Sequence, residues 1–237
     1  MTIGQRYPAT LRRVEQAALR VDRDPKSVRL IAVGKRFPLD AIEQAFAAGA
    51  RDFGENRVQE GVEKIAAFSD PPGHDTAHWH LIGPLQKNKV RKALASFSVI
   101  HTLDRPDLVH RMERLMEQDW PAQRKSVLVE VNIAGEEQKA GVLPGDAAAL
   151  AKLAAECPHL ELIGLMCIPP FGPDPEGSRR YFVALRGLRC RIEDQLGLPL
   201  PHLSMGMSND FEVAIAEGAT MVRVGTAIFG KRTPIPQ

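Results

Sequence analysis

This sequence lacks an excess of either charge, with 31 basic and 29 acidic residues among its 237. Such a balance gives no electrostatic reason to expect a nucleic-acid partner. Long apolar runs are missing too. No stretch approaches the roughly 18 apolar residues of a membrane span, and the first 20 residues have no apolar core of the signal-peptide kind. We therefore expect no membrane association and a cytoplasmic location.

Cysteine is also scarce. Cys157, Cys167 and Cys190 are odd in number and widely spaced, so they form neither a disulfide framework nor a metal site. This usage is typical of a reducing compartment. Because a buried free cysteine behaves as a small apolar side chain, we expect Cys167 to belong to the core.

The sequence does contain a regular alternation of apolar runs and amphipathic segments. Residues 8–20 form a first amphipathic segment, and eight strand–helix units follow it. The predicted strands are "VRLIAVGK", "RDFGEN", "HWHLIG", "FSVIHTL", "SVLVEVNI", "LELIGLM", "HLSMG" and "TMVRVG". Strands that alternate with helices indicate a parallel sheet, and eight units in this length indicate an α/β fold of the (β/α)8 barrel type. We expect one domain over 1–237, with a doubly wound open sheet as the main alternative.

The first predicted strand ends on a lysine. In such a barrel the active site lies at the carboxyl ends of the strands, and "VRLIAVGK" delivers Lys35 to that end. The residue either marks the point where the chain reaches solvent or supplies an amine for reaction with a carbonyl group.

The last two strands run into small and hydroxyl-bearing residues, in "SMGMSND" and "VGTAIFG". Phosphate sites of these barrels often follow strands seven and eight. Glycine lets backbone N–H groups approach an anion, and helix N-termini supply free donors. The same residues also serve as ordinary turns and caps. The two loops together leave both interpretations open; the phosphate site would be made by Ser204, Gly206, Ser208, Gly225 and Thr226.

Strand alternation in "TMVRVG" turns Arg223 into the barrel and Val222 and Val224 toward the helices. A buried arginine needs a carboxylate or a ligand, and an ion pair with Glu130 is the structural alternative. A reactive amine, a phosphate site and an inward arginine together indicate pyridoxal 5'-phosphate (PLP). Its aldehyde forms a Schiff base with lysine, and proteins meet its ring nitrogen with Asp or Arg. Arginine leaves that nitrogen unprotonated, which fits racemisation or simple carrying better than transamination.

Several segments resemble the pyridoxal phosphate homeostasis protein family: "LIAVGK", "RDFGENRVQE", "WHLIGPLQKNK", "VLVEVNI", "GLMCIPP" and "LSMGMSNDFEVAIAEGATMVRVGTAIFG". The resemblance covers nearly the whole chain. It implies a barrel similar to the N-terminal domain of alanine racemase and an intracellular role in PLP homeostasis or delivery without firm catalytic turnover. It also implies the site: Lys35 as the Schiff-base lysine, Arg223 beside the pyridine nitrogen, the phosphate among the residues named above, and Asn56, His80 and Met166 around the cofactor.

The sequence departs from its relatives in two ways. Gly34 stands where the family usually has serine, which removes a hydroxyl near the lysine. The second, β-rich domain through which alanine racemase supplies a tyrosine acid–base is also missing, and Tyr7 and Tyr181 lie at no predicted strand end. Two-base racemisation needs a proton donor on each face of the cofactor. We therefore expect a monomeric carrier or regulator, with a weak PLP-dependent amino-acid racemase as the alternative.

His74, Asp75, His78 and His80 suggest a metal site at first sight. A zinc site needs three or four ligands, and no further ligand here has suitable spacing, so no metal is predicted.

The segment 86–92, "QKNKVRK", is basic but has no interleaved aromatic residues. It is typical of a solvated helix face rather than of a nucleic-acid contact, although a surface that delivers PLP to client enzymes is a further hypothesis. Lys139 is either a loop lysine in solvent or a residue near the mouth of the site.

Overall fold

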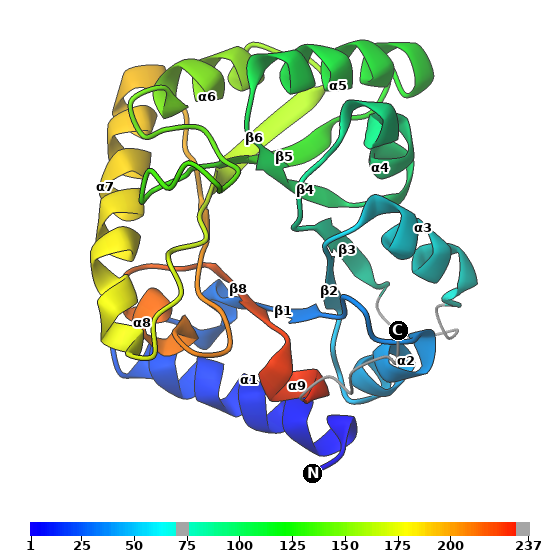
Figure 1. The fold of residues 1–237 in the computed structure, drawn as a ribbon, viewed down its shortest axis with the longest axis vertical. Coiled ribbons are helices and arrows are strands. Elements are labelled where there is room, and N and C mark those ends of the chain that lie inside the picture. The colour runs from blue at the N-terminus through cyan, green and yellow to red at the C-terminus, as the bar shows by residue number, and fades with distance from the viewer. Residues whose placement is uncertain (70–75, 231–237) are drawn as a thin grey trace.

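The computed structural model describes residues 1–69 and 76–230. These residues form a closed barrel of eight parallel strands in the order β1 to β8, with helices around it (Figure 1). The strands are β1 (Arg29–Val33), β2 (Asp52–Glu55), β3 (His78–Leu81), β4 (Val99–Leu103), β5 (Lys125–Glu130), β6 (Leu160–Met166), β7 (His202–Ser204) and β8 (Met221–Val224). The (β/α)8 prediction is confirmed, and the open sheet is wrong because β1 pairs with β8.

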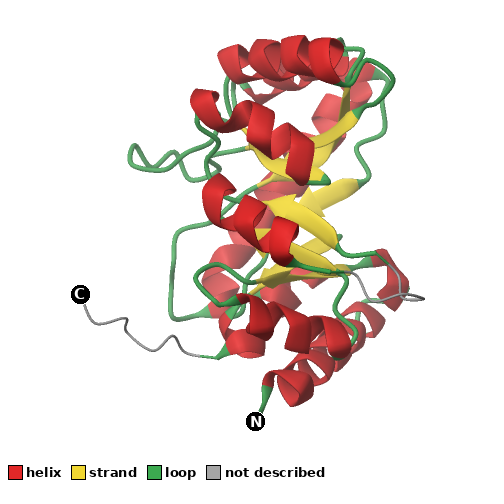
Figure 2. Ribbon diagram, turned by 90° about the vertical axis from the view of Figure 1, so that its right-hand side faces the viewer, coloured by secondary structure: helices red, strands yellow, loops and turns green. Residues whose placement is uncertain are grey.

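A helix follows each strand, and the strands run through the middle of the molecule with helices outside them (Figure 2). The helices are α1 (Ile3–Leu19), α2 (Leu39–Ala47), α3 (Val58–Ala67), α4 (Val90–Ser96), α5 (Pro106–Asp119), α6 (Ala147–Ala155), α7 (Arg179–Leu196), α8 (Phe211–Ala216) and α9 (Thr226–Phe229), with 3-10 turns at Pro25–Ser27, Lys87–Lys89 and Pro175–Ser178. Over the described part of the chain, none of them is long and apolar enough to cross a bilayer.

The first helix is longer than its sequence pattern predicts. It begins at Ile3 rather than at residue 8, so Pro8 lies inside it. The Thr2 amide donates to Oε1 of Gln5 over 3.0 Å, which closes the first turn ahead of the proline. This extra helix packs against α2, α8 and α9, which places it over the seam where β8 meets β1.

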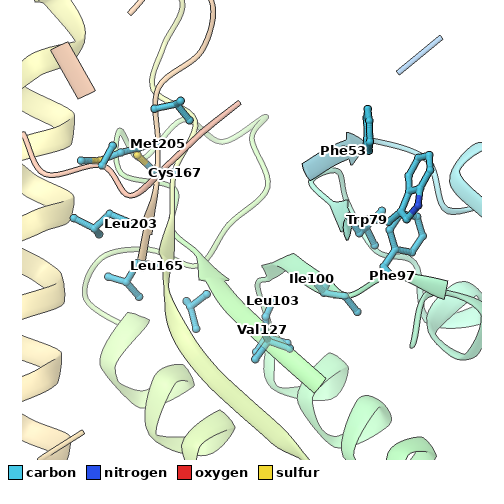
Figure 3. Packing of buried hydrophobic residues seen from close by; sticks show 14 of the residues in the cluster. Phe53, Trp79, Phe97, Ile100, Leu103, Val127, Leu165, Cys167, Leu203 and Met205 are labelled. Atoms are coloured by element: carbon cyan, nitrogen blue, oxygen red, sulfur yellow. The ribbon is translucent and has the colours of Figure 1, made fainter. Parts of the chain in front are cut away.

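Strand alternation divides the residues into an apolar outer layer and a mixed interior. Phe53 of β2 and Trp79 of β3 face the helices, with ring centroids 5.3 Å apart (Figure 3). Cys167 belongs to the same core, as its sequence context predicts. Inside the barrel, a small cluster of Val99 and Leu128 with a methionine fills part of the space. Other interior positions carry buried polar side chains, such as His80 and His101.

Candidate functional site

A cavity of about 290 Å³ opens where the carboxyl ends of the strands meet. That volume is at the lower end of the range for small-ligand pockets. The residues that line it come from the ends of β1 and β8 and from the loops after β1, β2, β3, β6, β7 and β8. They bring together six of the residues predicted to bind a cofactor: Lys35, Asn56, Ser208, Arg223, Gly225 and Thr226.

Lys35 is held at the mouth of the barrel by contacts of the residue before it. The carbonyl of Gly34 accepts a hydrogen bond from Nζ of Lys64, 2.8 Å away. The same ammonium group donates to Oε1 of Glu55 over 2.7 Å and to Oε1 of Glu60 over 2.8 Å. Helix α3 therefore fixes the end of β1, and with it the position from which the Lys35 side chain starts.

Gly34 has a steric reason to lack a side chain in this molecule. A Cβ at this position would lie 2.3 Å from Cδ1 of Ile42 and 3.1 Å from Oε1 of Glu55. Ile42 therefore fills from the helix side the space that a serine would occupy, and the departure from the family pattern is compensated by packing.

Glu55 is a buried carboxyl group close behind Lys35. Burial raises its pKa to about 7, although the hydrogen bond from Lys64 and the charge of Lys35 act in the opposite direction. Its Oε2 has no hydrogen-bond partner. Neither Glu55 nor Lys64 is predicted from the sequence as part of the site. The available signal was a carboxylate at a strand end followed nine positions later by a lysine in the next helix.

Arg223 points into the barrel, as strand alternation predicts, and only 4% of it is exposed. Its Nη1 donates to Oγ of Ser204 over 2.6 Å, and its Nη2 donates to the carbonyl of Cys167 over 2.8 Å. Arg223 also lines the cavity. The ion pair with Glu130 that the sequence left open is not among its recorded contacts: Oε2 of Glu130 is buried without a partner.

Glu130 supports a first prediction, on stability. Burial and the neighbouring charge of Asp104 raise its pKa from 4.5 to about 7, against the opposing effect of Arg223. A carboxyl group with a raised native pKa makes the protein lose stability as the pH rises from 4.5 through 7. Glu130→Gln removes that loss, so its advantage over the parent protein should grow across this window to about 3 kcal/mol at pH 8. Urea unfolding of both proteins at several pH values measures it, and a difference that stays constant with pH would contradict the assignment.

The loops after β7 and β8 are joined at the cavity. Oγ of Ser208 accepts a hydrogen bond from the Gly225 amide over 3.2 Å. Asp210 ties down its own loop by accepting from the Met207 amide over 2.7 Å. Thr226 follows at the start of α9, and Ser208, Gly225 and Thr226 all line the cavity. This donor set suits a phosphate group, because anions bind where N–H and O–H groups converge.

Four predicted cofactor residues lie behind the lining instead of in it: His80, Met166, Ser204 and Gly206. The two polar side chains bond to other interior groups, Met166 packs among apolar interior residues, and Gly206 forms the turn after β7 with φ +91°.

None of the other described candidates lines the cavity. His74 and Asp75 of the considered metal cluster are outside the described residues, and the described ones contain no group of three or more His, Cys, Asp or Glu that could hold a metal ion. In the basic segment, Lys87 pairs with Asp107. Lys139 pairs with Glu136 of its own loop.

Comparison with known proteins gives consistent matches over the full barrel. The model of the family "Alanine racemase, N-terminal domain" matches residues 10–233. The pyridoxal phosphate homeostasis protein of Aquifex aeolicus is 40% identical, over 98% of this chain and 99% of the relative, and that of Escherichia coli K12 is 42% identical over 93% and 92%. The structure of PipY from Synechococcus elongatus with PLP bound superposes with a TM-score of 0.81 at 37% identity, covering 97% of this chain and all of the other.

Proposed function

This chain belongs to the family of pyridoxal phosphate homeostasis proteins, and from that premise we propose that it binds PLP in the cavity at the carboxyl ends of its strands. One observation carries the proposal. A lysine from the first unit and an arginine from the last line the same 290 Å³ space, together with hydroxyl and glycine residues of the last two loops.

PLP supplies an aldehyde that condenses with a lysine amine, a phosphate that needs donors, and a ring nitrogen that needs a partner. Lys35 is the residue to which we assign the Schiff base. Ser208, Gly225 and Thr226 hold the phosphate. Arg223 donates to the ring nitrogen, and because guanidinium keeps its proton, the ring stays a weak electron sink. Asn56 contributes an amide side chain beside the lysine.

We assign the role of a carrier that holds and releases PLP within the cell, rather than that of an efficient racemase. The described lining contains no tyrosine, histidine or cysteine. Tyr7 is buried, with a pKa that burial raises to about 12, and Tyr181 accepts a hydrogen bond from Arg180 at the surface. Asp210 lines the cavity, but its carboxylate is engaged by the loop amide. A second proton donor for two-base racemisation is therefore not provided by these groups.

The proposal is tested on the purified protein incubated with PLP and dialysed. We expect a visible absorption band and, after borohydride reduction and peptide mass mapping, the cofactor fixed on Lys35. Mixing the loaded protein with the apo form of a PLP-dependent enzyme should restore its activity, while the protein alone should show no amino-acid racemisation at high concentration. A colourless protein that stays unmodified would overturn PLP binding, and rapid racemisation would replace the carrier by an enzyme.

A further inference from the structure

A row of hydrogen-bonded side chains crosses the inside of the barrel behind the cavity. Nη1 of Arg223 donates to Oγ of Ser204, which lies 2.9 Å from Nδ1 of His101. Nε2 of His101 lies 3.0 Å from Nδ1 of His80, and Nε2 of His80 lies 3.0 Å from Oδ1 of Asp52. The three middle residues have no solvent exposure. We call this row the interior chain (Arg223, Ser204, His101, His80 and Asp52).

The Asp52 end of the interior chain fixes where its protons lie. A carboxylate can only accept, whereas a neutral imidazole has one N–H donor and one acceptor nitrogen. Nε2 of His80 therefore carries the proton, and Nδ1 of each ring is the acceptor, so the Ser204 hydroxyl accepts from Arg223 and donates to Nδ1 of His101. His101 then donates from Nε2 to His80, which donates from Nε2 to Asp52. The reverse arrangement would set an unprotonated nitrogen of His80 against a carboxylate oxygen.

The charges along the interior chain agree with donation from Ser204 toward Asp52. Burial lowers the pKa of His101 well below its usual range, and it lowers that of His80 despite the opposing effect of Asp52. Burial by itself would raise the pKa of Asp52, but the hydrogen bond from His80 and nearby positive charges lower it overall. Arg29 and His78 face the same carboxylate, at 3.8 and 4.0 Å. These shifts favour the neutral form of both interior imidazoles, with the charged groups at the two ends of the interior chain.

We propose that Asp52, His80, His101 and Ser204 are positioning residues for Arg223: they fix the plane of its guanidinium and keep its remaining donor capacity turned toward the cavity. The effect on a bound cofactor rests on the proposed function, because the ring nitrogen of PLP is the acceptor that Arg223 would meet. Since the recorded hydrogen bonds of the guanidinium go to a hydroxyl and a backbone carbonyl, the interior chain is what connects it to a carboxylate.

The first test needs no cofactor. In apo protein labelled with 15N-histidine, NMR should show His80 and His101 neutral from pH 6 to 8, both with the proton on Nε2. Asp52→Ala removes the acceptor that fixes the direction, so both rings should lose their preference for Nε2–H and show the Nδ1–H tautomer as well. A cationic ring, a wild-type Nδ1–H tautomer in His101, or unchanged tautomers in Asp52→Ala would each overturn the direction of hydrogen bonding in the interior chain.

The second test compares two substitutions at one position. Ser204→Ala removes the link between Arg223 and His101, whereas Ser204→Thr keeps the hydroxyl. We expect separate Nη resonances of Arg223 in the parent protein and the Thr variant and their merging in the Ala variant, together with an increase of about tenfold in the Kd for PLP, roughly the weight of one good hydrogen bond to a charged group. Leu128→Met changes a residue inside the barrel that is not part of the interior chain. It is the control and should leave the Arg223 resonances and the Kd for PLP unchanged.

The outcomes separate the two proposals. If the parent protein does not bind PLP, the proposed function fails. The histidine tautomers and the Arg223 resonances still test whether the interior chain positions the guanidinium. If PLP binds and Ser204→Ala changes neither the Arg223 resonances nor the Kd, the row only fills the interior and the positioning role is wrong.

Discussion

Replacing Lys35 by alanine should abolish the visible band of the PLP-loaded protein and weaken PLP retention by about a hundredfold, since a covalent attachment is lost. The remaining donors, at Ser208, Thr226 and Arg223, still line the cavity, so residual noncovalent binding is expected. Absorption spectra and equilibrium dialysis measure the two effects. Borohydride treatment should then leave the variant unmodified.

Two further variants make this result specific to the amine. Lys35→Arg keeps the positive charge but forms no Schiff base, so it should behave like Lys35→Ala in the spectrum. Lys152→Ala removes an exposed lysine of α6 and should bind PLP like the parent protein. A Lys35→Ala protein that keeps its band, with the cofactor on another lysine, would show that the strand end is not the point of attachment.

Some of this architecture can be predicted from the sequence because it depends on periodicity alone. Alternation in β8 assigns the two valines to the outer core and Arg223 to the interior, and the structure agrees. The position of Lys35 follows in the same way, because a parallel barrel places every strand's carboxyl end at one mouth. Predictions of this kind need only the order and direction of the strands.

Contacts inside the barrel could not be predicted in the same way. Which partner Arg223 finds depends on strand tilt and register, which place Ser204 beside it and leave Glu130 unpaired. His101 was not singled out at all, although its Nδ1 lies 2.9 Å from Ser204, a residue more than a hundred positions away. The local sequence around a single histidine in an apolar strand does not indicate its hydrogen-bond partners, because closure of the barrel brings those partners together.

Gly206→Ala is expected to have the largest effect on stability, because the turn after β7 tolerates no side chain. The residue has φ +91°, and an added Cβ would lie 2.5 Å from Cβ of Ala214 and 3.0 Å from Cα of Phe211. Both neighbours belong to the short helix α8, so neither can swing aside as a flexible side chain could. Backbone strain and overpacking together should lower the free energy of unfolding by about 4 kcal/mol.

The same change should also weaken PLP binding. The carbonyl of Gly206 accepts a hydrogen bond from the amide of Arg223 over 2.9 Å, so a shift of this turn reaches both the arginine and the loop that carries Ser208. We expect Tm to fall by about 10 °C. Gly187→Ala is the matched control: this glycine lies inside α7, and an added Cβ would lie 3.6 Å from Nη1 of Arg191, so alanine should stabilise the protein by about 0.5–1 kcal/mol. Equal melting temperatures for the two variants would mean that the turn after β7 accepts a side chain without strain. The turn would then not be what fixes the loops after β7 and β8.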